Sequence, residues 1–427
     1  MSCYIQCVPR GRAKRGFVLS VSNSMCKKQV TKAQSSFKER ALLLSAKSKH
    51  CSDLNKEVKT IQAGEIMFKM PQYTAPDFSK EPFSSFPDVT TEKAGDGYIP
   101  ENFYATTIFP EYFKIGGEWK MLTKSRMDCS VVIRDGQPYA VEMRNIKDGD
   151  EVVVGRTDDG TNGVFVHCDG FREEDEVSEN SQSFAFRQGQ SRETSYSKDY
   201  DRLYEILRHD RDHGKIVWVL GPACAFDKDS RKAMADLIDN GYCHALFAGN
   251  ALATHDMEAD RFHTALGQDI YSKEVTFNGH YNHLHLINLV RKAGGVKQYV
   301  EKNNVKTGIM SALVRNNVPF VLAGSIRDDG PLPDVIGNVY EAQDAMRAHT
   351  KEATTVIALA TQLHTIATGN MTPSYQVVDG IVRPVYFYVV DVSEFAVNKL
   401  KDRGSLSVTG VVTNVQDFVV NISKNLV

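Results

Sequence analysis

The feature that most constrains the fold of this 427-residue chain is an alternation in its second half. After about residue 200, short apolar runs alternate with segments of helical period. Strands buried on both faces have continuous apolar sequences, and their alternation with helices is typical of a parallel sheet covered by helices. We therefore predict that residues 201–427 form an α/β, Rossmann-like domain with a largely parallel sheet. The expected strands cover 215–221, 244–249, 318–323, 355–360, 385–390 and 406–412, and the expected helices include 229–239 and 393–402.

A different pattern precedes this region. Between residues 80 and 170, strand-like segments alternate with turns, and Asp135-Gly136 is typical of a two-residue hairpin turn between strands over 129–134 and 139–143. We predict a small β-rich domain over 80–170. Residues 171–200 are polar and carry an acidic cluster, which favours a linker. We set residues 1–60 aside as a basic leader.

Charge is divided unevenly along the chain. The net charge of −2 (51 − 53) combines a leader with 13 Lys+Arg and 3 Asp+Glu and a remainder with 38 and 50. The acidic remainder argues against nucleic-acid binding, and no apolar run reaches the ~18 residues of a membrane span. A basic, serine-rich leader is typical of a transit peptide to a mitochondrion or plastid, and a disordered tail on a cytoplasmic protein is the alternative.

Cysteines and histidines do not indicate a metal site. No Cys-x-x-Cys occurs among the eight cysteines, which fits reduced thiols, and we favour a core role over a nucleophilic one for Cys224. His280, His283 and His285 match no zinc-ligand spacing. We interpret this histidine motif as a polar helix start or as substrate contacts.

The carboxyl ends of the predicted strands are where a ligand is expected, because open α/β sheets bind ligands there. Asp391 stands at the end of a buried strand, where it suits either the ribose hydroxyls of a dinucleotide or a helix N-cap. Gly221-Pro222-Ala223 suits either close approach of a cofactor or an ordinary turn. Neither the Gly-x-Gly-x-x-Gly fingerprint nor a P-loop occurs.

Arg327 and the two aspartates after it form the best candidate for amino-acid binding. A guanidinium binds a carboxylate in bidentate fashion. Neighbouring carboxylates bind an ammonium group or accept a proton. An internal ion-pair network that fixes the loop is the alternative.

Several of these segments together resemble a known family. Ala248–Asp256 (AGNALATHD), Val318–Val335 and Ala360–His364 are similar to archaeal-type, NAD-dependent ornithine cyclodeaminases. The same module forms the C-terminal part of bifunctional arginine dihydrolase/ornithine cyclodeaminases. Glu101–Thr107 and Met127–Cys129 resemble the companion region named for lysine-ketoglutarate reductase/saccharopine dehydrogenase. The resemblance covers roughly residues 80–425.

The resemblance implies a lyase that converts ornithine to proline and ammonia, with bound NAD taking a hydride and returning it. It implies NAD contacts at Asn250, Ala251, Asp329, Thr361, Gln362, Leu363, His364 and Asp391. Three further roles are our own physical hypotheses: Arg327 for the substrate carboxylate, Asp256 for proton transfer and Asp328 for the δ-ammonium. We expect a homo-oligomer that binds a small amino acid.

Two other functions remain open on the sequence. One is an amino-acid dehydrogenase of the saccharopine or opine type, and the other is a non-catalytic, NAD-binding regulatory subunit. A leader of about 60 residues is too short to hold an arginine-hydrolysing domain, so we do not expect arginine dihydrolase activity.

Overall fold

The computed structural model describes residues 69–171, 197–393 and 407–427. Residues 68–427 form one compact unit. The predicted leader, most of the linker and all but the first residue of the helix expected over 393–402 lie outside the described residues. No helix within the described ranges has the length and apolar character that a membrane crossing requires.

The β-rich region contains two antiparallel sheets. One has the order β1-β6-β4-β5 and the other β3-β2-β7. The hairpin predicted around Asp135-Gly136 is confirmed: β4 and β5 pair across it, and both turn residues have positive φ, as a tight hairpin turn requires. The strands are β1 (Thr90–Lys93), β2 (Glu111–Ile115), β3 (Glu118–Met121), β4 (Ser130–Arg134), β5 (Gln137–Val141), β6 (Glu151–Val154) and β7 (Val164–Val166), with the 3₁₀ helix η1 (Met143–Asn145).

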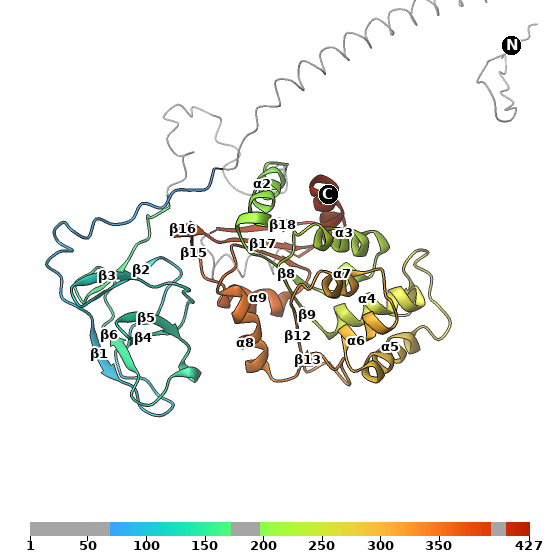
Figure 1. Ribbon diagram of the computed structural model, residues 1–427, viewed down its shortest axis with the longest axis horizontal. Coiled ribbons are helices and arrows are strands. Elements are labelled where there is room, and N and C mark those ends of the chain that lie inside the picture. Colours follow the sequence, from blue (N-terminus) through green and yellow to red (C-terminus); the bar gives the residue numbers. More distant parts are fainter. Residues whose placement is uncertain (1–68, 172–196, 394–406) are drawn as a thin grey trace, which may run out of the picture. The chain divides into compact units, whose positions relative to one another are not determined.

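The second region is built on a seven-stranded parallel sheet, which confirms the predicted fold class (Figure 1). Its order is β13-β12-β9-β8-β14-β17-β18, so chain order reverses at β8 as in Rossmann sheets. The strands are β8 (Ile216–Leu220), β9 (Ala245–Gly249), β12 (Phe320–Ala323), β13 (Val335–Ile336), β14 (Thr355–Leu359), β17 (Tyr386–Asp391) and β18 (Ser407–Val412).

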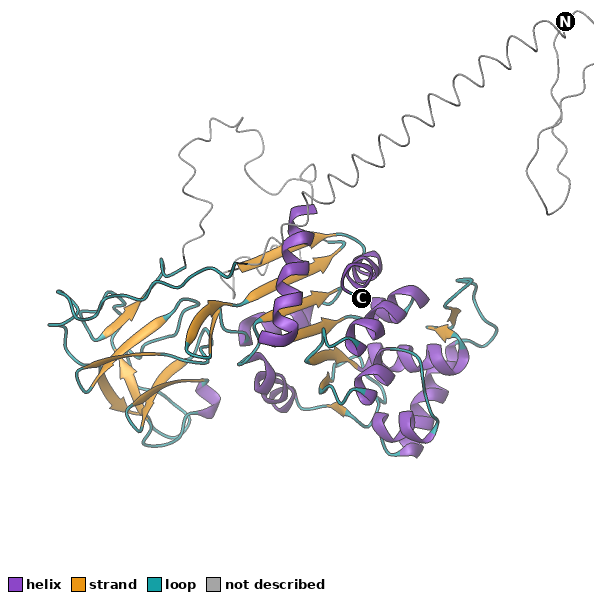
Figure 2. Cartoon of the chain, turned by 45° about the horizontal axis from the view of Figure 1, so that its top comes forward, coloured by secondary structure: helices purple, strands orange, loops and turns teal. Residues whose placement is uncertain are grey.

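Helices cover both faces of this sheet, and the strands supply apolar side chains to each (Figure 2). In β8, Ile216, Trp218 and Leu220 join one core, and Val217 and Val219 join the other, because successive strand residues point to opposite faces. The first core lies under α3 (Lys228–Asp239), α4 (Asn250–Phe262), α5 (His280–Ala293), α6 (Val296–Lys302), α7 (Ile309–Arg315) and α11 (Val415–Leu426), with α2 (Ser197–His213) and the 3₁₀ helix η4 (Pro222–Ala225). The second lies under α8 (Val339–Thr350) and α9 (Gln362–Met371).

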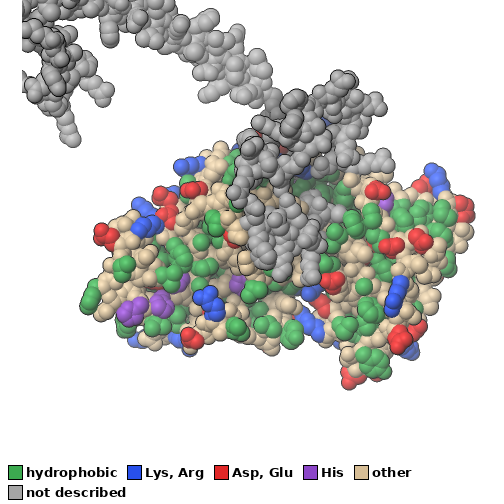
Figure 3. Space-filling view, turned by 180° about the vertical axis from the view of Figure 1, so that it is seen from behind, with side chains coloured by type: hydrophobic (Ala, Val, Ile, Leu, Met, Phe, Trp, Pro, Cys, Tyr) green, Lys and Arg blue, Asp and Glu red, His purple; other side chains and the backbone are tan. Residues whose placement is uncertain are grey.

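Two small hairpins were not predicted. The pair β10 (Thr264–Ala265) and β11 (Gln268–Asp269) follows α4, and the pair β15 (Tyr375–Val378) and β16 (Ile381–Pro384) precedes β17. On the face shown in Figure 3, Lys and Arg side chains are interspersed with Asp and Glu. Charge therefore does not single out a binding surface on the described part of that face.

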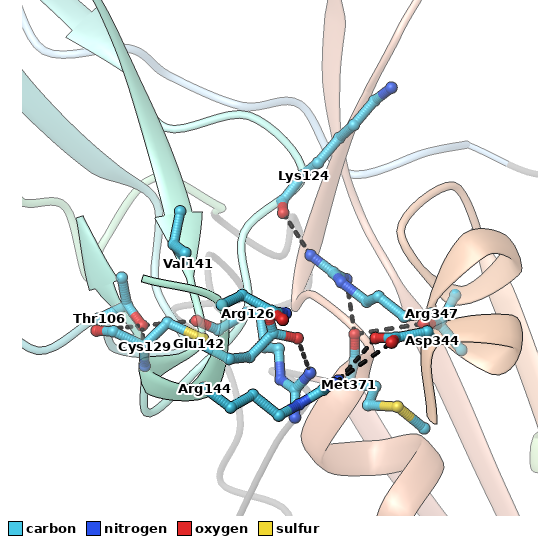
Figure 4. A network of polar contacts seen from close by, with 12 residues as sticks. Thr106, Lys124, Arg126, Cys129, Val141, Glu142, Arg144, Asp344, Arg347 and Met371 are labelled. Carbon is cyan, nitrogen blue, oxygen red and sulfur yellow. Dashed lines mark hydrogen bonds and ion pairs between the residues drawn. The ribbon is translucent and has the colours of Figure 1, made fainter. Parts of the chain in front are cut away.

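Polar contacts join the β-rich region to α8, which also bonds to the end of α9 (Figure 4). Arg347 of α8 donates hydrogen bonds to the carbonyl oxygens of Met371 (2.7 Å) and Lys124 (2.6 Å). Burial, together with the nearby charge of Arg126, lowers the pKa of Arg347 to about 10. Arg144 forms an ion pair with Asp344 at 2.6 Å. These contacts fix α8, the helix that leads into β14, against the β-rich sheets.

Candidate functional site

The carboxyl edge of the parallel sheet has a switch point between β8 and β14. From this point, successive connections run in opposite directions, and open α/β sheets bind ligands at such a point. The two strand ends approach each other closely at Gly221, where an added Cβ would stand 2.0 Å from the Ala360 carbonyl oxygen. Glycine is therefore required there by space. The segment after Gly221 is the 3₁₀ helix η4, so the turn is not a direct strand-to-helix connection.

The two helices that begin beside this point lack side-chain caps. Gly249 precedes α4 and Thr361 precedes α9, and neither provides a capping hydrogen bond. By contrast, α3, α8 and α11 are capped by the side chains of Asp227, Asn338 and Asn414. The first amides of α6 and α7 bind Asp334 and Asp256, and α5, which follows Gly279, also lacks a side-chain cap. Uncapped N-terminal amides and the positive end of the helix dipole favour an anion such as a pyrophosphate.

Residues from three strand ends meet between these helices. An added Cβ on Gly249 would lie 3.2 Å from Cε1 of His364, and Thr361 Oγ1 lies 3.4 Å from His364 Nδ1. The Asn250 side-chain oxygen accepts a hydrogen bond from the Leu332 amide at 3.0 Å. Burial lowers the pKa of His364, and Asp328 opposes this shift. The structure thus brings Asn250, Thr361 and His364 together, with Ala251 half-buried beside Asn250.

Asp391 ends β17, the strand next to β14 on the other side of the switch point. Its Oδ1 accepts a hydrogen bond from the Ser393 amide at 2.9 Å. The side chain is half-buried, as a carboxylate that meets a ligand hydroxyl requires. The helix that Asp391 was expected to cap lies outside the described residues, so both interpretations of this carboxylate remain.

The loop after β12 carries the predicted substrate-binding residues at the surface. Arg327 and Asp329 are exposed, and Asp328 is half-buried and accepts a hydrogen bond from the Ser325 amide at 2.9 Å. No ion pair joins Arg327 to either aspartate in the described part of the chain. Gln362 and Leu363 are also exposed. Apolar and polar side chains therefore share this edge, a mixture typical of cofactor sites.

Asp256 lies elsewhere. It is 1% exposed, and its Oδ1 binds Arg231 Nε at 2.7 Å. Both carboxylate oxygens also accept hydrogen bonds from the first amides of α7, Ile309 at 2.9 Å and Met310 at 2.8 Å. This placement does not fit the proton-transfer role suggested by the sequence, because the carboxylate is enclosed and its oxygens are occupied by structural partners.

Three further features lie apart from these residues. A hollow of about 360 Å³ is lined by Arg211, Asp212, Cys243, His244 and Asn316, among others, at the opposite, amino edge of the sheet, and contains none of the predicted site residues. The predicted helix start at the histidine motif is confirmed, since α5 begins at His280. Cys224 is fully buried and burial raises its pKa to about 12, which favours the core role.

Comparisons with known proteins agree with the fold of this chain. Residues 202–422 match the family model described as arginine dihydrolase ArgZ-like, C-terminal, Rossmann fold, and residues 110–196 match the first region of the same C-terminal part. An ornithine cyclodeaminase of Methanopyrus kandleri is 40% identical over 342 residues, 78% of this chain and 76% of the relative.

Two solved structures are also similar. A putative LOR/SDH protein from Methanococcus maripaludis aligns with a TM-score of 0.71 and 35% identity, over 80% of this chain and 98% of that one. The ternary complex of AgrE with ornithine and NAD+ aligns with a TM-score of 0.50 and 32% identity, over 80% of this chain and 46% of AgrE. This chain therefore spans about half the length of AgrE.

Proposed function

We propose that this chain, which belongs to the family of ornithine cyclodeaminases and ArgZ-like C-terminal modules, is itself an NAD-dependent ornithine cyclodeaminase. It converts L-ornithine to L-proline and ammonia. The reaction has no net redox change, because the hydride removed from the substrate returns to the cyclic imine. Binding of ornithine and NAD+ by the similar protein AgrE supports both ligands.

The observation that carries this proposal is the pair of uncapped helices at the switch point. α4 and α9 both begin beside the close approach of Gly221 and Ala360, and their open amides suit the pyrophosphate of NAD. Asp391, one strand further, suits a ribose. Bound NAD supplies a hydride acceptor at the carboxyl edge.

The remaining residues take roles that follow from their placement. Asn250, Ala251, Thr361 and His364 lie where NAD contacts are expected, and Gln362, Leu363 and Asp329 lie at the exposed mouth. Arg327, exposed and without an ion-pair partner among the described residues, is the candidate for the substrate carboxylate, with Asp328 for the δ-ammonium. We assign Asp256 a structural role, as the cap of α7 and the partner of Arg231.

The test is turnover by the purified full-length protein. With ornithine and NAD+, we expect equimolar proline and ammonia without accumulation of NADH, and a large loss of activity in Arg327→Ala. NADH accumulating in step with substrate loss would instead identify an amino-acid dehydrogenase. NAD binding without any consumption of ornithine would identify a non-catalytic subunit.

Two finer proposals concern the setting of the enzyme. The basic leader directs the chain to a mitochondrion or plastid, which a fluorescent fusion with and without residues 1–60 tests. The chain forms a homo-oligomer in solution, which light scattering measures. If the fusion without residues 1–60 has an unchanged location, the targeting proposal is wrong. If the protein is a monomer at micromolar concentration, the proposal of a homo-oligomer is wrong.

A further inference from the structure

The second turn of α4 brings a histidine and a glutamate together on a different side of the helix from Asp256. His255 Nδ1 lies 2.8 Å from Oε2 of Glu258, one helical turn further on. The His255 ring also contacts Phe226, with the ring centroids 5.5 Å apart, and His283 of α5, at 6.1 Å. Three separate segments of the chain therefore meet at His255.

Glu258 is held rigidly in this arrangement. Its side chain is fully buried, and its second oxygen, Oε1, accepts a hydrogen bond from Thr264 Oγ1 at 2.8 Å. Thr264 Oγ1 in turn accepts one from Asn282 of α5 at 2.9 Å. A carboxylate only accepts hydrogen bonds, so it places the proton of the neutral imidazole on Nδ1 and leaves the lone pair on Nε2.

Among the residues that the structure describes, Nε2 of His255 and Nδ1 of His283 have no hydrogen-bond partner. Nε2 of His255 makes no hydrogen bond to the described residues and is not enclosed, although only 8% of the side chain is exposed. Nδ1 of His283 is buried without a hydrogen-bond partner among the described residues. An orphaned buried nitrogen is costly, and it is explained if a ligand completes it. Burial lowers the pKa of His283, with Glu258 opposing, which favours the neutral ring.

The dyad of His255 and Glu258 belongs to the same edge of the sheet as the cofactor residues. α4 begins at Asn250, one of the expected NAD contacts, and His255 follows five residues later. Phe226 closes η4, the segment that starts at Gly221 beside the switch point. His255 therefore lies about one and a half turns into the helix that begins at the cofactor edge.

We propose that His255, oriented by Glu258, is the catalytic base for ornithine and that His283 helps to bind the substrate's nitrogen. This inference rests on the proposed function and names the group that moves a proton within it. His255 Nε2 takes one proton from the α-ammonium, which leaves a neutral amine whose lone pair forms the carbon–nitrogen double bond as hydride departs to NAD+. The δ-ammonium gives two protons to water as its nitrogen bonds to the C=N carbon, and the imidazolium returns its proton to the α-nitrogen, whose bond to carbon then breaks to release ammonia. The ammonia and the reduced ring nitrogen each take up one proton from water, so the protons balance overall.

The experiment compares three variants of the full chain. His255→Asn keeps a donor toward Glu258 but has no basic nitrogen, so proline formation should fall about 10²–10⁴-fold, while NAD+ affinity stays within about twofold. His285→Gln is the matched control, because His285 belongs to the same motif but its ring contacts Phe262 and Tyr281 instead of His255. We expect that control to retain wild-type turnover.

The variant Glu258→Gln tests whether the Glu258 carboxylate orients His255 or only fills space in the core. Without the carboxylate the imidazolium loses its charged partner, so the acidic limb of the kcat/KM profile should move to lower pH, with a smaller loss of rate than in His255→Asn. The titratable groups around His255 are Glu258, His283 and, beyond His283, His280, and only Glu258 is changed in this variant. A structural role for Glu258 would leave the limb in place.

The outcomes separate this inference from the proposed function. If wild type and His255→Asn form proline equally well, the inference is wrong but the proposed function stands. The same holds if the acidic limb of the kcat/KM profile does not move in Glu258→Gln. Wild-type protein that binds NAD+ but forms no proline contradicts both. Loss of proline formation with NAD+ affinity retained, together with the shifted limb, supports both.

Discussion

The two edges of the parallel sheet differ in the burial and pairing of their charged side chains. At the amino edge, Asp210 of α2 and Arg383 of β16 are 0% and 2% exposed and form a bidentate pair at 2.8 and 3.0 Å. Thr354 and Thr355, at the start of β14, donate to the same carboxylate at 2.6 and 2.7 Å. At the carboxyl edge, Asp391 and Arg327 remain accessible and two helices begin without caps.

The difference shows where the fold tolerates incomplete bonding. A buried charge is stable only when its partners are present, and at the amino edge the Asp210 carboxylate receives its partners from the protein itself. The carboxyl edge leaves donors and acceptors for a ligand, at some cost to its own stability. Changes at the first edge should therefore affect unfolding, and changes at the second should affect cofactor binding.

The largest effect is expected from Asp210→Ala. It leaves the Arg383 guanidinium buried without its partner, which should lower the free energy of unfolding by about 3–5 kcal/mol. Urea unfolding followed by circular dichroism measures this. NAD+ affinity of the remaining folded protein should be unchanged.

A double variant sharpens this prediction. Asp210→Leu combined with Arg383→Met removes both charges, and apolar replacement of a buried ion pair is often neutral, so most of the lost stability should return. If Asp210→Ala unfolds at the same urea concentration as wild type, the amino edge is not a stabilising network and the contrast between the edges fails.

Asp391→Ala tests the carboxyl edge. Loss of hydrogen bonds between a carboxylate and ribose hydroxyls, about 1.5–3 kcal/mol, should weaken NAD+ binding roughly 10- to 100-fold. Isothermal titration calorimetry measures the affinity, and the urea midpoint should stay near that of wild type. Glu301→Ala, which removes an exposed acid from α6, serves as the control. Unchanged affinity in Asp391→Ala would favour the N-cap interpretation.

The strands were predictable from the sequence because each is buried on both faces. β8 and β14 lie within one or two residues of their predicted bounds, since their apolar runs have no polar face to blur the ends. The strand order was not predictable in detail, because it depends on contacts between residues far apart in the chain. The β15–β16 hairpin was missed although its turn, Asp379-Gly380, is a recognised signal.

Site residues at strand ends were predictable, because their position along the strand fixes the edge of the sheet at which they lie. Site residues on helices were not, because the direction in which each helix faces is not evident from the sequence. Asn250, Thr361 and Asp391 follow strand ends, so their common edge was expected. Asp256 and His255 are neighbours on α4, and every residue from 252 to 259 is buried, so no polar face distinguishes them. The i, i+3 spacing of His255 and Glu258 was the available signal, but only packing shows that Asp256 turns toward Arg231.

The smallest predicted effect is on how the free energy of unfolding changes with pH, and it comes from His364 at the carboxyl edge. Burial lowers the pKa of His364 below its usual ~6.5. As pH falls below about 6.5, the unfolded chain takes up a proton that the folded chain resists, so this residue makes the fold less stable at lower pH. For Asp210, burial alone would raise the pKa, but Arg383 and Thr354 lower it, so Asp210 is ionised in both states above pH 5.5.

The prediction is therefore a difference between two pH profiles. From pH 8 to 5.5, the free energy of unfolding of wild type should fall relative to that of His364→Gln. Urea unfolding at intervals of half a pH unit measures both. Subtraction of the variant profile removes the contribution of His244, His283 and His349, whose pKa values burial also lowers. Parallel profiles for wild type and His364→Gln would mean that His364 is hydrated at the open edge and carries no penalty for charge.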